Sequence, residues 1–143
     1  MTSAIRPPPV NEQIRLWVID DPGQMRMVRA SLLEVLTGQP ALSITADDEV
    51  LQAVVIVATE LMSNALQHGL PARSVRVGRG DGCLVVDVVD HELTAGPEYV
   101  RDRPMDRGGF GLRLVLELAS DMGWCVIGAS KHVWATIALA GRL

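Results

Sequence analysis

The apolar residues of the chain recur with the two periods that separate helices from strands. Spacings of three and four residues, each series ending just before a glycine, predict amphipathic helices over 22–37, 46–68 and 108–122. Short runs rich in Val and Ile predict strands over 14–19, 74–79, 83–90, 124–128 and 132–139. A Gly-Asp-Gly turn at 80–82 joins the second and third strands into a hairpin.

The order of these elements predicts the fold class. A strand, two helices, a hairpin, a loop, a helix and two strands correspond to a mixed, mostly antiparallel sheet with helices on one face, an α/β (α+β) sandwich of two layers. Residues 1–13, which contain Pro7-Pro8-Pro9, are expected to form a flexible tail, and residues 14–143 a single domain. Residues 91–107 lack an apolar period and are expected to form a mobile, lid-like loop.

The second helix carries three polar side chains at intervals of four residues. Four residues make about one turn, so Glu60, Asn64 and His68 project from one face of a helix whose other side is apolar. A solvated polar face is one interpretation. The other is a binding site, in which the amide oxygen of Asn64 is a Mg²⁺ ligand and Glu60 takes up a proton. His68 is then expected to orient its neighbours or to cap the helix end.

Two further features admit both a structural and a functional interpretation. Asp90 shares a strand face with Leu84, Val86 and Val88. Its carboxylate is expected either to form a salt bridge or face water at the strand end, or to accept a hydrogen bond from an amino group of a ligand. The glycines of Gly108-Gly109-Phe110-Gly111 precede a helix, whose N-terminal N–H groups suit phosphate, although glycine before a helix is common.

Composition narrows the class of protein. The 143 residues contain 13 basic and 17 acidic side chains, a net charge of −4, without a basic cluster, which argues against nucleic acid as a partner. The N-terminus lacks an apolar signal region, and the uninterrupted apolar runs are too short for a membrane span, so a cytoplasmic protein is expected. Cys83 and Cys125 are expected to be reduced thiols in the protein interior.

The motifs, taken in order, resemble the GHKL ATPase superfamily and its Bergerat ATP-binding fold. "ELMSNALQHG" resembles the N-box, Asp90 the aspartate of the D-box, and "GGFGLRLV" the second glycine box. The segment "ATELMSNALQHG" and the final strand "KHVWATIAL" resemble more narrowly the standalone anti-sigma-factor serine/threonine kinases. The resemblance extends from about residue 14 to residue 140, and the N-box is its most specific part.

The resemblance implies a role for each matching residue. Glu60 is the general base, Asn64 the Mg²⁺ ligand and Asp90 the acceptor for the adenine amino group. The remaining nucleotide-binding residues lie at the start of the third helix, where the glycines let the lid and the helix approach the phosphates; they are Gly108, Gly109, Gly111 and Leu112.

Two departures from the family pattern affect the nucleotide site. The D-box normally continues Asp-x-Gly-x-Gly, but here Asp90 is followed by His91-Glu92-Leu93-Thr94 without either glycine. The threonine of the last strand that assists adenine binding is expected to be replaced by His132. Both changes bear on the affinity for nucleotide and leave the scaffold intact.

The resemblance implies that the chain uses ATP and Mg²⁺ to phosphorylate an anti-anti-sigma partner on serine or threonine, and that it holds a sigma factor inactive. The alternative is a regulator of the same fold that binds a sigma factor or an antagonist without phosphoryl transfer, which the missing glycines favour. A sensor histidine kinase is excluded by size, since the sequence has neither a dimerisation helix pair nor a phospho-acceptor histidine box. Members of this family are commonly dimers, so a homodimer is an expectation.

Overall fold

The computed structural model describes residues 4–38, 48–94 and 109–139. Its strands are β1 (Ala4–Ile5), β2 (Glu12–Val18), β3 (Ser74–Gly80), β4 (Cys83–Asp90), β5 (Asp121–Ile127) and β6 (Ser130–Ala138). Its helices are the short 3₁₀ helix η1 (Pro22–Gln24) and the α-helices α1 (Met25–Thr37), α2 (Asp48–His68) and α3 (Gly109–Leu118).

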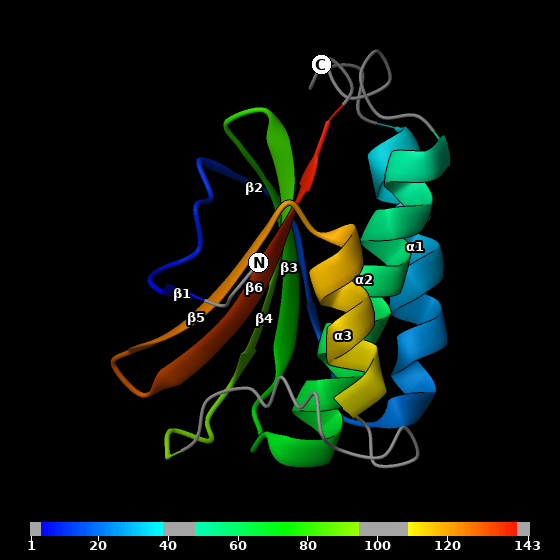
Figure 1. Cartoon of the computed structure of the whole chain (residues 1–143). Coiled ribbons are helices and arrows are strands. Elements are labelled where there is room, and N and C mark those ends of the chain that lie inside the picture. Colours follow the sequence, from blue (N-terminus) through cyan, green and yellow to red (C-terminus); the bar gives the residue numbers. More distant parts are fainter. Residues whose placement is uncertain (1–3, 39–47, 95–108, 140–143) are drawn as a thin grey trace.

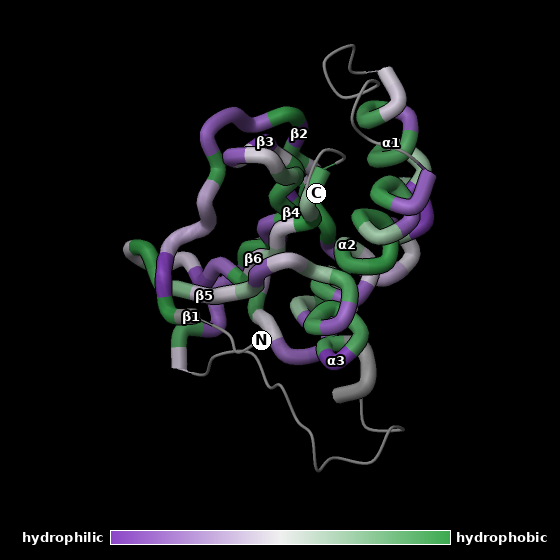
Figure 2. Tube along the Cα trace, turned by 45° about the horizontal axis from the view of Figure 1, so that its top comes forward, coloured by the Kyte–Doolittle hydropathy of each residue, from purple (hydrophilic) through white to green (hydrophobic). Residues whose placement is uncertain are grey.

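The strands form one sheet in the order β1-β5-β6-β4-β3-β2. Neighbouring strands are antiparallel except β1 and β5, which are parallel. The three α-helices lie on one side of this sheet, as the two views in Figure 1 and Figure 2 show. The predicted sandwich of two layers with a mixed, mostly antiparallel sheet is therefore confirmed.

Strand β4 lies inside the sheet and determines which residues meet the helices. Its side chains alternate between the two faces, and Leu84, Val86 and Val88 belong to the hydrophobic core on the helix side. Asp90 follows at the same two-residue interval and is 1% exposed. The sequence period thus places a carboxylate at the end of an otherwise apolar strand face.

The helix predicted over 22–37 is present as η1 followed by α1, which begins at Met25 and ends where the sequence predicts. Asp21 caps η1 through a hydrogen bond from the N–H of Gly23 to Oδ1 at 2.8 Å, with Pro22 at the first position, and Gly38 follows the last residue of α1. The side chain of Trp17 donates from Nε1 to Ser31 Oγ at 3.0 Å, which ties β2 to α1.

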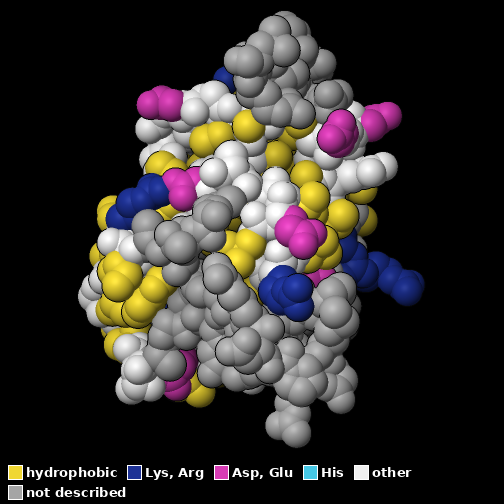
Figure 3. Space-filling view, viewed as in Figure 1, with side chains coloured by type: hydrophobic (Ala, Val, Ile, Leu, Met, Phe, Trp, Pro, Cys, Tyr) yellow, Lys and Arg dark blue, Asp and Glu magenta, His cyan; other side chains and the backbone are white. Residues whose placement is uncertain are grey.

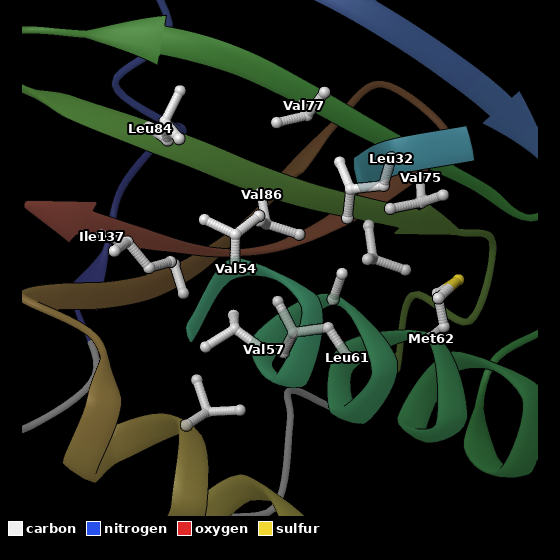
Figure 4. Packing of buried hydrophobic residues seen from close by; sticks show 14 of the residues in the cluster. Leu32, Val54, Val57, Leu61, Met62, Val75, Val77, Leu84, Val86 and Ile137 are labelled. Carbon is white, nitrogen blue, oxygen red and sulfur yellow. The ribbon is translucent and has the colours of Figure 1, made fainter. Parts of the chain in front are cut away.

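Helix α2 supplies the largest share of the helical side of the core. Its buried residues recur every three or four positions and are Val50, Val54, Val57, Ala58, Leu61, Met62 and Ala65. Figure 4 shows Val54, Val57 and Leu61 pointing toward the strands that carry Val86 and Val75. One side of α2 is thereby committed to the sheet, while Glu60 and Asn64 lie on the other.

Helix α2 is also long and apolar enough, by length and composition, to pass for a membrane-spanning helix. Among the described residues, α2 alone meets this criterion. Its apolar side chains pack against β4 and β6. The packing in the core accounts for its apolar composition.

The boundary between α3 and β5 differs from the prediction. The helix ends at Leu118, and Met122 belongs to β5 rather than to the helix. Ser120 lies at the turn, where its N–H donates to Thr136 O at 2.8 Å and ends the helical hydrogen bonding. Met122 is buried in the core as a strand residue, so its apolar character fitted the helical spacing by coincidence.

Part of the segment expected to be a flexible tail is paired with the sheet. Ala4 and Ile5 pair with Gly123 and Trp124 of β5. Arg6 forms an ion pair with Asp121, its guanidinium lies 4.5 Å from the ring centroid of Trp134, and its carbonyl accepts from Trp134 Nε1 at 2.8 Å. The predicted lid over 91–107 lies outside the described residues, apart from 91–94.

The end of α2 is joined closely to the end of β4. Gly69 follows the helix, and a Cβ atom at this position would lie 2.5 Å from Asp90 Cγ and 2.7 Å from Ala65 O. Gly69 does not have a positive φ angle, so the position requires glycine for space rather than for backbone conformation. The N–H of His91 then donates to Leu70 O at 2.9 Å, which continues the junction.

The substitution Gly69→Ala is expected to lower the free energy of unfolding by about 1–3 kcal/mol, because the new methyl group would overlap a buried carboxylate and a helical carbonyl. Urea unfolding followed by far-ultraviolet circular dichroism measures this change. Gly38→Ala is the matched control, since its Cβ would meet Glu34 O at 3.3 Å and should cost less. Equal stability losses in the two variants would contradict the steric role of Gly69.

Candidate functional site

Three elements bring the predicted site residues to one end of the molecule. The C-terminal end of α2, the C-terminal end of β4 and the N-terminal end of α3 all lie at the lower end in Figure 1. Helix α2 contacts both α3 and β4 directly. The structure thus gathers the N-box-like helix, Asp90 and the start of the glycine-rich helix into one region.

The polar row of α2 remains available to a ligand. Glu60 and Asn64 are half-buried and His68 is exposed. Within the described part of the chain, none of these three side chains forms a hydrogen bond or an ion pair. Burial raises the pKa of Glu60 above its usual value. A partly desolvated carboxylate without a partner is suited to take up a proton.

Asp90 is bound on both of its oxygens. Oδ1 accepts a hydrogen bond from the N–H of Glu92 at 2.7 Å, and Oδ2 lies 3.6 Å from Lys131 Nζ. Asp90 and Lys131 are direct partners across β4 and β6, and Lys131 is 3% exposed. The structural interpretation of Asp90 as a salt-bridge residue is therefore correct for this structure, and its role toward a ligand remains a prediction.

His132 does not lie beside Asp90, although that place is expected for the residue that replaces the threonine near adenine. His132 lies on the sheet face away from the helices, where its Nδ1 is 2.9 Å from Asp87 Oδ2. The neighbouring residue Lys131 faces Asp90 instead. The register between β4 and β6 decides this, because successive residues of a strand point to opposite faces. Lys131 is thus the residue of the last strand that sequence reasoning missed.

The glycine-rich segment is described only in part. Gly109 begins α3, Gly111 lies in its first turn, and Gly108 is outside the described residues. Leu112 is 3% exposed and its side chain belongs to the hydrophobic core. Only its backbone could therefore contact a nucleotide. A helix N-terminus at this place is compatible with phosphate binding, and the role of the glycines remains a prediction.

The polar row of α2 fits a metal ion that is bound together with a nucleotide. The described residues contain no group of three or more His, Cys, Asp or Glu side chains suited to hold a metal alone. A single amide such as that of Asn64 suits Mg²⁺ when phosphate oxygens and water complete its shell. Gly69 packs so closely on Asp90 that a Cβ atom there would come within 2.7 Å of Oδ2, which holds the carboxylate beside the end of α2.

The opposite face of the sheet carries a second polar cluster, which the sequence did not reveal. Asp87 is fully buried and bound by Arg76, with Nη2 to Oδ2 at 2.6 Å, and by His132. Cys125 is buried nearby and not in a disulfide, and burial and the charge of Asp87 raise its pKa, which keeps it a thiol. These residues come from four different strands. The carboxylate of Asp87 is paired by the side chains of Arg76 and His132.

On the face shown in Figure 3, the described Lys and Arg side chains stand in separate groups and form no continuous stripe. A stripe of this kind is the usual footprint of a protein that binds the phosphate backbone.

Comparison with known proteins identifies a protein family and a solved structure of similar fold. The family described as histidine kinase-like ATPase domain matches residues 18–137. The crystal structure of the RsbU and RsbW domains of Rv1364c from Mycobacterium tuberculosis is similar with a TM-score of 0.58 and 22% identity. The similarity covers 87% of this chain and 32% of that chain, so the chain spans about a third of its relative. No curated protein sequence is significantly similar to the chain.

The raised pKa of Glu60 predicts a pH-dependent effect of Glu60→Gln on stability. The unfolded state loses the proton near the usual value of 4.5, while the folded state retains it to higher pH, so ionisation of Glu60 lowers the stability of the wild type as pH rises. We expect the variant to have the higher melting temperature at pH 7 to 8 and the difference to shrink toward pH 4. Thermal unfolding across this range measures it, and a difference independent of pH would contradict the desolvated carboxylate.

Proposed function

Because the chain belongs to the family of histidine kinase-like ATPase domains, we propose that it binds ATP and Mg²⁺ where α2, β4 and α3 meet. We further propose that it is an anti-sigma regulatory factor and a serine/threonine kinase for an anti-anti-sigma partner. The observation that carries this proposal is the pair Glu60 and Asn64, half-buried on one face of α2 and without a partner among the described residues. Because no described protein group uses this carboxylate and this amide, both are available to bind a ligand at the surface of the core.

Each residue of the site has a separate task in this proposal. The amide oxygen of Asn64 would hold Mg²⁺, which supplies charge neutralisation for the phosphates when bound. Asp90 would accept a hydrogen bond from the base, and the N-terminus of α3 with Gly108, Gly109 and Gly111 would face the phosphates.

Glu60 would take the proton from the attacking hydroxyl group of the partner. The hydroxyl oxygen forms a bond to the γ-phosphorus, and the bond from that phosphorus to the bridging oxygen of ADP breaks. The proton passes to the Glu60 carboxylate, whose raised pKa favours this uptake. The products are a phosphorylated serine or threonine and ADP.

The partners follow from the sequence resemblance to standalone anti-sigma kinases. The similarity of the fold to a chain that includes an RsbW domain supports the same scaffold. In this proposal the chain is cytoplasmic, holds a sigma factor and releases it upon exchange with the anti-anti-sigma protein, with a homodimer as the working assembly.

The alternative is a regulator that binds its protein partner without catalysis. Two observations favour it. The segment after Asp90 lacks both glycines of the family pattern. In addition, the carboxylate of Asp90 is already bound by Glu92 N–H and lies within ion-pair distance of Lys131. The two functions share the fold and differ in whether nucleotide binds and phosphate is transferred.

Asn64→Ala is expected to abolish stabilisation of the protein by MgATP and leave the fold intact, because it removes the proposed metal ligand from a partly exposed position. At about 100 times the dissociation constant, ATP should stabilise the wild type by roughly 2.7 kcal/mol, a shift in melting temperature on the order of 5–10 °C. Thermal unfolding with and without MgATP and MgADP provides the test. An equal shift in the variant would exclude Asn64 as the ligand.

Glu60→Gln should preserve MgATP binding and reduce phosphorylation of the anti-anti-sigma partner by about 10²-fold or more, since it removes the proposed base without altering its shape. Incorporation of labelled phosphate from ATP measures the transfer. Glu34→Gln, on the exposed side of α1, is the control. Transfer at the wild-type rate in Glu60→Gln would remove Glu60 from the mechanism, and nucleotide binding without transfer in the wild type would support the non-catalytic alternative.

A further inference from the structure

We propose that Lys131 sets the base selectivity of the nucleotide site, so that the Asp90–Lys131 pair accepts a 6-oxopurine as readily as adenine. This inference rests on the proposed function, because it concerns the same site. It assigns to Lys131 a role that neither the family pattern nor the comparison with known proteins predicts.

The geometry places one donor and one acceptor side by side. Asp90 Oδ1 is engaged by the short hydrogen bond from Glu92 N–H, at 2.7 Å. Oδ2 is 3.6 Å from Lys131 Nζ, which is within ion-pair range but longer than a hydrogen bond. Oδ2 is therefore the oxygen that a ligand atom can share with the ammonium group.

The carboxylate that carries this oxygen is held in place by its close contact with Gly69 at the end of α2. A Cβ atom on residue 69 would lie 2.7 Å from Asp90 Oδ2. Lys131 itself is held in place by strand pairing, as the direct partner of Asp90 on β6, and is almost fully buried. A long flexible side chain in such a position cannot turn away into solvent without losing its stem contacts and leaving the carboxylate unpaired.

The substituent at position 6 of the purine determines which base this pair of side chains favours. Adenine presents an amino donor at position 6, whereas hypoxanthine and guanine present a carbonyl acceptor there. A carboxylate alone offers acceptors only, so it favours the amino group and repels the carbonyl.

An ammonium group beside the carboxylate affects the binding of both kinds of base, and both effects reduce the preference for adenine. It competes with the adenine amino group for Oδ2, which weakens the binding of ATP. It also donates to the carbonyl of a 6-oxopurine and reduces the repulsion from the carboxylate, which strengthens the binding of ITP or GTP. Lys131 thereby reduces the preference for ATP that Asp90 would have by itself.

The test compares ATP with ITP, because hypoxanthine differs from adenine only at this edge of the ring. Dissociation constants for both nucleotides with Mg²⁺ are measured by isothermal titration calorimetry on wild type and Lys131→Met. Lys131→Thr is measured in parallel, since its small side chain leaves room for water beside the carboxylate should the methionine variant fail to fold. His132→Gln is the matched control, because His132 is adjacent in sequence but bound to Asp87 on the other face.

We expect wild type and His132→Gln to bind ATP and ITP within about threefold of each other, and the Lys131 variants to prefer ATP by tenfold or more. A wild type that already prefers ATP by tenfold, or Lys131 variants that lose both nucleotides equally, would overturn the role of Lys131 while leaving ATP binding in place. If neither wild type nor any variant binds either nucleotide, the proposed function fails, and this inference fails with it.

Discussion

Helix α2 has to cover the centre of the sheet with one side and present polar groups on the other, and the rest of the structure is arranged around this constraint. Its buried residues, from Val50 to Ala65, pack on the strands that form the middle of the sheet. Because that apolar contact fixes the rotation of the helix, the direction of Glu60 and Asn64 is determined by core packing and not by any contact of their own. Burial beside this core also raises the pKa of Glu60, so the packing that holds the helix prepares the carboxylate for proton uptake.

The position of the helix along its own axis depends on a second contact. Gly69 lies against Asp90 so closely that no larger residue fits, and the N–H of His91 donates to Leu70 O just beyond it. A sliding movement of α2 relative to β4 would therefore bring backbone into contact with a buried carboxylate. This junction links the polar row of the helix to the acidic end of the strand, and thus the two halves of the site are held in a constant relation.

The sequence was sufficient for features that depend on local periods. The four-residue spacing of Glu60, Asn64 and His68 and the two-residue spacing that ends in Asp90 both correspond to the faces seen in the structure. The motifs also pointed to the correct family, since the match to histidine kinase-like ATPase domains covers residues 18–137.

Features that depend on pairing between distant strands could not be predicted from local sequence periods. The expectation for His132 was one residue out because only the register of β4 against β6 shows that Lys131 faces Asp90. The pairing of Ala4 and Ile5 with β5, and the cluster around Asp87, have the same non-local origin.

The departures from the family pattern are confined to one part of the site. Glu60 and Asn64, which would act on the phosphates, are positioned by the packing of α2, whereas Asp90 and Lys131, which would meet the base, are positioned by the pairing of β4 and β6. A substitution on β6 can therefore change the contacts proposed for the nucleobase without rotating the helix that carries Glu60 and Asn64. The loss of the two glycines after Asp90 falls on the strand side of this division. In the proposed function, the helix side of the site supplies the phosphate chemistry and the strand side recognises the nucleobase, so substitutions can alter one of them without displacing the other.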